Sequence, residues 1–158
     1  MRDRRADMMD RIRDDITRVG WSGMAIFPTE DSPGLTWNYT IGLTAHDHPE
    51  MMVQGLEPRV GHHIIGNAAD QVIKGGRYEP NQYYDEILEP PFKVGIVEVL
   101  SVMDKAFPFT SAIEVYGEIK GLQIVWPDEN NRFPWHEDYQ REKFGHRQIL
   151  AGPWLGEE

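Results

Sequence analysis

Two segments rich in aromatic and β-branched residues, 21–27 and 35–43, flank the sequence Asp31-Ser32-Pro33-Gly34. Aromatic and β-branched residues favour strands, whereas Asp, Ser, Pro and Gly favour a reversal of the chain. The two segments therefore predict a β-hairpin. A third short apolar segment at 51–56 extends the hairpin to an antiparallel meander.

Two further segments show the periodicity of amphipathic helices. Residues 4–19 end at Gly20, which suits the left-handed position that follows a helix, and residues 58–74 begin at Pro58, which suits a first helical turn. The expected buried stripes are Met8, Ile12, Ile16 and Val19 in the first helix and Val60, Ile64, Ala68, Val72 and Ile73 in the second.

The second half of the chain gives weaker signals. Residues 92–100 and 122–126 predict two more strands, residues 110–116 a short helix, and residues 77–91 an ordered loop. The expected fold class is α+β, with an antiparallel sheet or partly closed barrel of about five strands and two to three helices.

The chain of 158 residues has the size of a single domain. No internal repeat or inter-domain linker interrupts it. We divide this one domain into an N-terminal amphipathic helix (1–19), a body (20–150) and a tail (151–158).

The formal net charge is −10, and nearly all of the excess lies in the body, because residues 1–18 contain six Arg and five Asp. An acidic surface repels phosphate backbones and anionic lipids, so neither nucleic acid nor a membrane is an expected partner. The sequence has no cysteine, no secretion signal and no apolar run close to the roughly 20 residues that span a bilayer. We therefore expect a cytoplasmic protein without disulfides.

His46, His48 and Glu50 are the nearest approach to a metal-binding cluster in the sequence. Imidazole and carboxylate suit zinc, iron or manganese, but three ligands from one short loop share an ion only if that loop folds back on itself. We therefore interpret the group as a polar turn that ends at Pro49, and we expect neither a metal nor another cofactor. The alternative is a metal- or water-using hydrolase or transferase with a site near His48, Glu50 and Asp128.

Two tryptophans and two prolines surround an acidic residue within residues 123–135. Pro127, with its fixed φ, directs Asp128 out of the sheet after the predicted strand ends. We predict that Trp126, Asp128 and Trp135 lie together as one wall of a binding site, because stiff aromatic surface is typical of ligand sites and interfaces. The alternative is that Asp128 accepts backbone N–H groups of its own turn and that both tryptophans cover the core.

Several short sequence blocks occur in a specific order along the chain. They are Trp21, Tyr39-Thr40-Ile41-Gly42-Leu43, Pro49-Glu50, Gly55-Leu56, Asn67 in the second helix, Gln123 to Asp128, Phe133-Pro134-Trp135 and Gln148-Ile149-Leu150. With these blocks, residues 20–150 resemble the bacterial and phage family known as domain of unknown function 4262. The resemblance implies a compact domain without an established activity, so it assigns no functional residue.

The sequence has no motif of nucleophilic catalysis, phosphate binding or dinucleotide binding, while aromatic residues are plentiful. We therefore expect a non-catalytic accessory protein that binds a small molecule or another protein, with a homodimer as one possible assembly. An acidic phage-type inhibitor of a host protein is a third hypothesis. The candidate ligand-binding residues are Tyr39, His48, Glu50, Trp126, Asp128 and Trp135.

Overall fold

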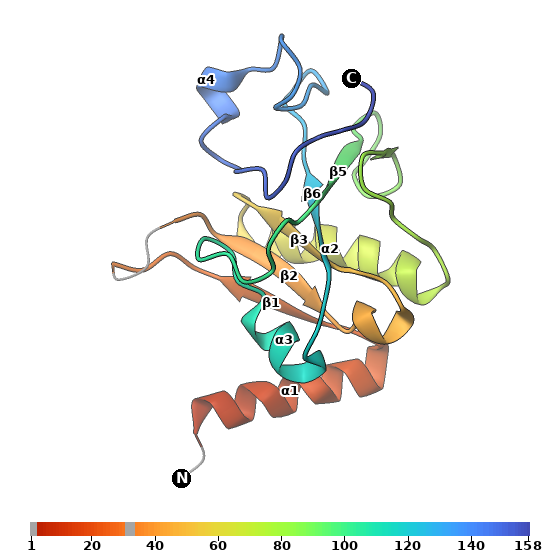
Figure 1. Cartoon of the computed structure of the whole chain (residues 1–158), viewed down its shortest axis with the longest axis vertical. Coiled ribbons are helices and arrows are strands. Elements are labelled where there is room, and N and C mark those ends of the chain that lie inside the picture. The colour runs from red at the N-terminus through yellow and green to blue at the C-terminus, as the bar shows by residue number, and fades with distance from the viewer. Residues whose placement is uncertain (1–2, 31–33) are drawn as a thin grey trace.

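The computed structural model describes residues 3–30 and 34–158 (Figure 1). Its elements are α1 (Arg4–Val19), β1 (Ser22–Ile26), β2 (Trp37–Ile41), the 3₁₀ helix η1 (Leu43–His46), β3 (Glu50–Gln54), α2 (Pro58–Ile73), β4 (Tyr83–Tyr84), β5 (Val94–Glu98), α3 (Thr110–Tyr116), β6 (Gly121–Val125) and α4 (Arg141–Phe144). Helices and one sheet are both present, so the α+β class is confirmed. The predicted turn residues Asp31, Ser32 and Pro33 lie outside the described residues.

The strands form one open six-stranded sheet in the order β1-β2-β3-β6-β5-β4. β1, β2 and β3 form the predicted antiparallel meander, and β4, β5 and β6 form a second antiparallel group. The two groups meet at β3 and β6, which are parallel, with Glu50 opposite Gly121. The sheet is thus mixed and open, which corrects the expectation of a wholly antiparallel sheet or a partly closed barrel.

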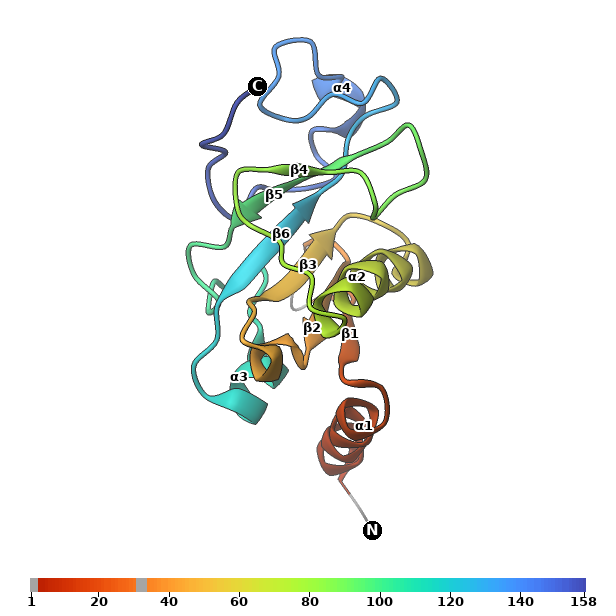
Figure 2. The same ribbon diagram turned by 90° about the vertical axis from the view of Figure 1, so that its right-hand side faces the viewer.

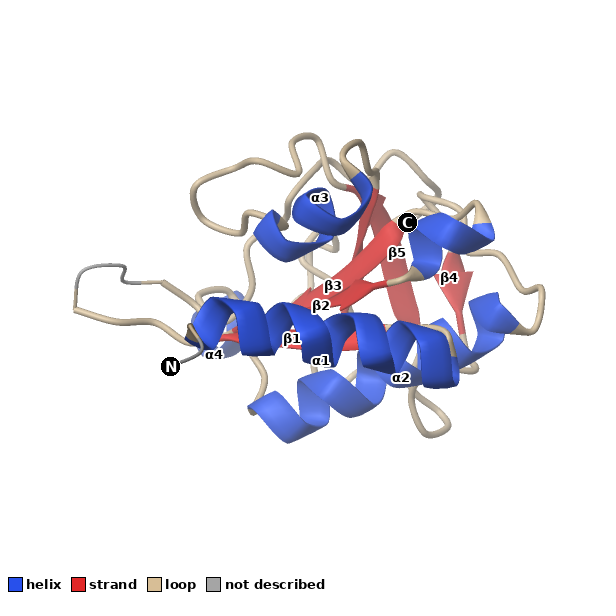
Figure 3. Cartoon of the chain, turned by 90° about the horizontal axis from the view of Figure 1, so that it is seen from below, coloured by secondary structure: helices blue, strands red, loops and turns tan. Residues whose placement is uncertain are grey.

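Helices cover both faces of the sheet, with a hydrophobic core on each. On one face α2 packs on Met51 and Val53 of β3. On the other face α1 and α3 pack on Tyr39 of β2 and Met52 of β3. Figure 3 shows α2 and α3 on opposite sides of the strands. Alternate residues of β3 therefore point into different cores, as the pleat of a strand requires.

Both predicted long helices form, but each buries a slightly different set of residues from the predicted stripe. In α1, Met9 and Ile12 are buried, whereas Val19 is 48% exposed. In α2, Ile64 is buried, whereas Val60 is 46% exposed. Both exposed residues lie in a terminal turn of their helix. Among the described residues, no helix combines the length and the apolar character needed to span a membrane.

The segment 148–151 is attached to the centre of the sheet by side-chain amides of buried glutamines. Gln54 of β3 accepts a hydrogen bond through Oε1 from the backbone N–H of Ile149 at 2.7 Å. Gln123 of β6 accepts one from the N–H of Ala151 at 2.7 Å and donates one to the carbonyl of Ile149 at 3.0 Å. In Figures 1 and 2 this dark-blue part of the chain passes beside β5 and β6. The segment thereby connects the two antiparallel groups of strands.

Candidate functional site

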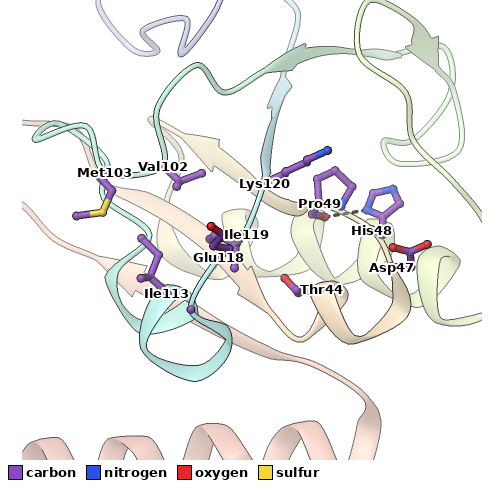
Figure 4. A pocket seen from close by; sticks show the side chains of 11 residues that line it. Thr44, Asp47, His48, Pro49, Val102, Met103, Ile113, Glu118, Ile119 and Lys120 are labelled. Carbon is purple, nitrogen blue, oxygen red and sulfur yellow. Dashed lines mark hydrogen bonds between the residues drawn. The ribbon is translucent and has the colours of Figure 1, made fainter.

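A cavity of about 680 Å³ lies at the N-terminal ends of β3 and β6 (Figure 4). One wall comes from η1 and the loop that follows it, with Thr44, His48 and Pro49. The opposite wall comes from residues 102–103 with α3, and residues 117–120 complete the lining. The cavity thus combines an apolar surface with a few polar groups.

The sheet topology explains why these loops meet. β3 and β6 are parallel neighbours, so the chain enters both strands at the same end of the sheet. The backbone N–H of Glu50 donates to the carbonyl of Lys120 at 2.9 Å, which joins the two entering loops. A second cavity of about 410 Å³ shares Pro49, Val102, Ile119 and Lys120 with the first. We refer to the two cavities together as the groove.

Glu50 is fully buried behind the groove, and its carboxylate holds the η1 loop in place. The carboxylate accepts backbone N–H groups from Gly42 at 3.3 Å, Leu43 at 3.1 Å and Thr44 at 2.9 Å. It also accepts the hydroxyl groups of Thr40 and Thr44. Burial raises the pKa of Glu50, and the donors around the carboxylate oppose that rise. All of these donors belong to the protein itself, so Glu50 positions the loop.

His48 lines the groove but is only 5% exposed, and both ring nitrogens have partners inside the protein. Nδ1 lies 2.8 Å from the carbonyl oxygen of Pro49, and Nε2 lies 3.0 Å from the backbone nitrogen of Tyr78. A carbonyl only accepts and a backbone N–H only donates, so Nδ1 carries the proton and Nε2 accepts. Burial lowers the pKa of His48, which favours this neutral ring. The imidazole therefore connects the loop before β3 to the segment after α2.

We expect the contribution of His48 to folding stability to be lost as the pH falls below about 6.5, the ordinary pKa of histidine, whereas Glu50, whose pKa is raised by burial, contributes with the opposite sign. The pKa of His48 is lowered by burial in the folded state, so the unfolded chain binds the proton first and gains free energy relative to the folded state. The pKa of His136 is also lowered, mainly by burial, and contributes with the same sign. Urea denaturation at about pH 7.5 and about pH 5.5 measures this loss.

A His48→Gln variant separates the contribution of His48 from that of His136. The variant is expected to be less stable than the natural chain at neutral pH, because Gln does not reproduce both ring hydrogen bonds. It is also expected to lose less stability on acidification, because one of the two titrating groups is gone. The same acid-dependent loss in both proteins would contradict the assignment of this titration to His48.

Asp128 is buried, and its carboxylate closes its own turn. Oδ1 accepts the backbone N–H groups of Asn130 at 2.8 Å and Arg132 at 3.0 Å. Oδ2 accepts the N–H of Gln140 at 2.9 Å. The bonds from Asn130 and Arg132 correspond to the alternative in which Asp128 satisfies the backbone of its own turn, and the bond from Gln140 ties that turn to the residue before α4.

The three residues of the predicted wall are divided between two places. Trp126 and Asp128 line a third cavity of about 300 Å³, where the indole N–H of Trp126 donates to the carbonyl of Gln54 at 2.7 Å. Trp135 is not part of that lining and stacks on Trp154, with ring centroids 4.2 Å apart. The predicted tail therefore contributes an aromatic side chain that packs on the body of the domain.

The alternative catalytic site would need His48, Glu50 and Asp128 in one place. Glu50 lies opposite Gly121, the first residue of β6, whereas Asp128 follows the end of that strand. A strand rises about 3.3 Å per residue, so the two carboxylates lie at opposite ends of β6. Within the described residues, no three His, Asp or Glu side chains form a group that could hold a metal ion.

Tyr39, the remaining candidate, is buried in the core under α3. Its ring stacks on Trp37 with centroids 4.8 Å apart, and its hydroxyl accepts the backbone N–H of Ser111 at 3.1 Å. Burial raises the pKa of this hydroxyl. Tyr39 is not part of the groove lining and holds the first turn of α3 against the sheet.

Sequence reasoning identified His48 and Pro49 of the groove and missed the opposite wall. Met103, Glu118 and Lys120 belong to no motif and lie in stretches without strand or helix periodicity. Only the pairing of β3 with β6 brings them next to His48. The apolar residues within 99–107 are interrupted by Ser101, Asp104 and Lys105 without a regular period, so the local sequence gives no signal for this wall.

The profile of the family described as "Domain of unknown function (DUF4262)" matches residues 15–140. The matched range extends from the second half of α1 to the residue before α4, and it contains every strand of the sheet. No curated protein and no solved structure matches the chain.

Proposed function

We propose that this chain, which belongs to the DUF4262 family, is a non-catalytic binding protein whose ligand or partner occupies the groove. The observation that carries the proposal is the cavity of about 680 Å³ at the N-terminal ends of β3 and β6. Binding sites are typically concave, mostly apolar and supplied with a few polar groups, and cavities of roughly 300–1,000 Å³ are usual. We further propose a cytoplasmic location, which the absence of cysteine supports.

The hydrogen bonds of the candidate acid and base groups support binding over catalysis. A general acid or base must reach the proton that it transfers. His48 uses both ring nitrogens on Pro49 and Tyr78, and Glu50 accepts five donors from Thr40 of β2 and from residues 42–44. The polar atoms of both side chains are therefore engaged within the protein, although His48 is also part of the groove lining.

A screen of small organic fragments by NMR tests the proposal. Backbone amide shifts of isotope-labelled protein report where each fragment binds, whatever the natural ligand is. We expect the fragments to shift the amides of Thr44, Gly117 and Ile119, which line the first cavity. Fragments that gather instead around Trp126 and Phe144 in the third cavity, or that shift no groove amide, would contradict the proposal.

A further inference from the structure

We propose that the occupant of the groove is a short extended segment of a partner protein, with apolar side chains and at least one Lys or Arg. This inference rests on the proposed function and specifies its partner. Three properties of the groove carry it, namely its length, its exposed apolar side chains and its excess of carboxylates.

The groove is long and open along the surface. The two cavities, of about 680 Å³ and about 410 Å³, share Pro49, Val102, Ile119 and Lys120 and are therefore neighbours on the surface. Met103 lines the first cavity and is 69% exposed, and Leu100 lines the second and is 71% exposed. A small molecule is usually enclosed over most of its surface. Lining side chains this exposed suit a chain that lies along the groove.

The exposed apolar side chains are concentrated on one wall. Leu100 and Met103 lie three residues apart, and the partly buried Ile113 and Ile119 continue the same apolar surface into the first cavity. Figure 4 shows Met103 and Ile113 on the side of the groove across from His48. Single exposed apolar residues are normal, but a contiguous group beside a depression marks an interaction site. Flexible Met side chains are frequent in such surfaces.

The charges of the lining favour a basic partner. Asp47 and Glu118 line the first cavity and Glu98 the second, against the single ammonium group of Lys120. Among the described residues, none of the three carboxylates forms an ion pair with Lys or Arg. The whole chain carries a net charge of −10, which attracts a basic partner over long distances.

Lys120 lines both cavities, and it suits the backbone of a bound segment. Its side chain is exposed, and its ammonium group can only donate hydrogen bonds. The main-chain carbonyls of an extended segment are acceptors spaced along its length. Lys120 therefore provides a donor for the backbone of the segment, while the carboxylates on either side bind its basic side chains.

Selection of random peptides displayed on phage tests the inference with the full chain as bait. We expect the enriched peptides to combine apolar residues with Lys or Arg. Fluorescence anisotropy with synthetic copies should show that Leu100→Asp and Met103→Asp each weaken binding by roughly tenfold or more, a loss typical of a central interface contact. Both side chains are exposed, so the variants are expected to fold, which their melting temperatures verify.

Two control variants match these substitutions in chemistry and exposure. Leu155 is 75% exposed and lies outside the groove lining, so Leu155→Asp should leave peptide affinity unchanged. Glu118→Lys should weaken the binding of basic peptides, whereas Glu137→Lys, at an exposed residue outside the lining, should not. Enriched peptides without basic residues, or with equal affinity for the groove variants and the controls, would overturn the inference. Fragments that bind the groove while no peptide is enriched would overturn this inference alone and leave the proposed binding function standing.

Discussion

Replacing Gly55 by alanine is expected to destabilise the protein by about 2–5 kcal/mol. Gly55 has a φ of +78°, a region that disfavours side chains, and a Cβ built there lies 1.5 Å from the carbonyl oxygen of Arg147. The methyl group can fit only if the backbone of Arg147 moves away. That movement pulls on the adjacent segment 148–151, whose N–H groups are held by Gln54 and Gln123.

Gly75→Ala is the matched control for this prediction. Gly75 also has a positive φ, +100°, but nothing lies within 4 Å of a Cβ built at this position. The control therefore retains the backbone strain, worth about 1–2 kcal/mol, without the clash. Urea denaturation of both variants separates the cost of the backbone strain from the cost of the clash with Arg147. Equal losses of stability would show that Gly55 does not support the segment at 147.

Replacing Glu50 by alanine is expected to cost about 3–5 kcal/mol of folding free energy. The substitution removes the acceptor of three backbone N–H groups, from Gly42, Leu43 and Thr44. These donors lie in a buried or partly buried loop, and a buried donor without an acceptor lowers the free energy of unfolding. The same loop forms one wall of the groove, so the variant should also lose fragment and peptide binding.

Glu50→Gln distinguishes the hydrogen bonds from the packing of the side chain. Gln keeps the shape and one acceptor oxygen, but its amide N–H₂ would face the donors that surround Glu50 in the natural chain. An intermediate loss of stability, measured by urea denaturation beside the alanine variant, is expected. An alanine variant within about 1 kcal/mol of the natural chain would show that these bonds contribute little net stability.

Local sequence patterns predict the helices and the first three strands because their signals lie within each element. The stripe of α1 ends at Gly20, and the structure ends the helix there with a φ of 93°. Aromatic and β-branched residues on both sides of one turn likewise specify the pairing of β1 with β2. The short strand β4 lies inside the segment 77–91, which the sequence predicts as a loop. Only Tyr83 and Tyr84 of that segment pair with β5, so the strand is too short to show a periodic pattern.

The centre of the sheet could not be predicted in the same way. β3 and β6 are far apart in the sequence, and neither carries a local mark of its parallel partner. The hydrogen bonds of Gln54 and Gln123 to the segment 148–151 also join residues that are distant in the sequence. The sequence does not distinguish these two glutamines from other polar residues in short strands. Both the pairing of β3 with β6 and the hydrogen bonds of the two glutamines thus depend on residues that are distant in the sequence.

For the candidate site, the sequence likewise shows which residue types are present but not which partners they contact. The sequence correctly drew attention to His48 and Glu50, since buried polar side chains need specific partners. Their roles depend on Tyr78 and on the N–H groups of η1, which the sequence alone does not place. The groove itself is made of ordinary residues that become neighbours only in the folded chain.

The attachment of residues 148–151 to β3 and β6 has a consequence for biosynthesis. The ribosome releases the chain from its N-terminus, so both strands emerge before the segment that bonds to Gln54 and Gln123. Until that segment emerges, the nascent chain exposes two glutamine amides and the apolar surface around them. Exposed apolar surface of this kind makes incomplete chains prone to aggregation and recognised by chaperones. A chain truncated before residue 148 would therefore retain both strands but leave this surface uncovered.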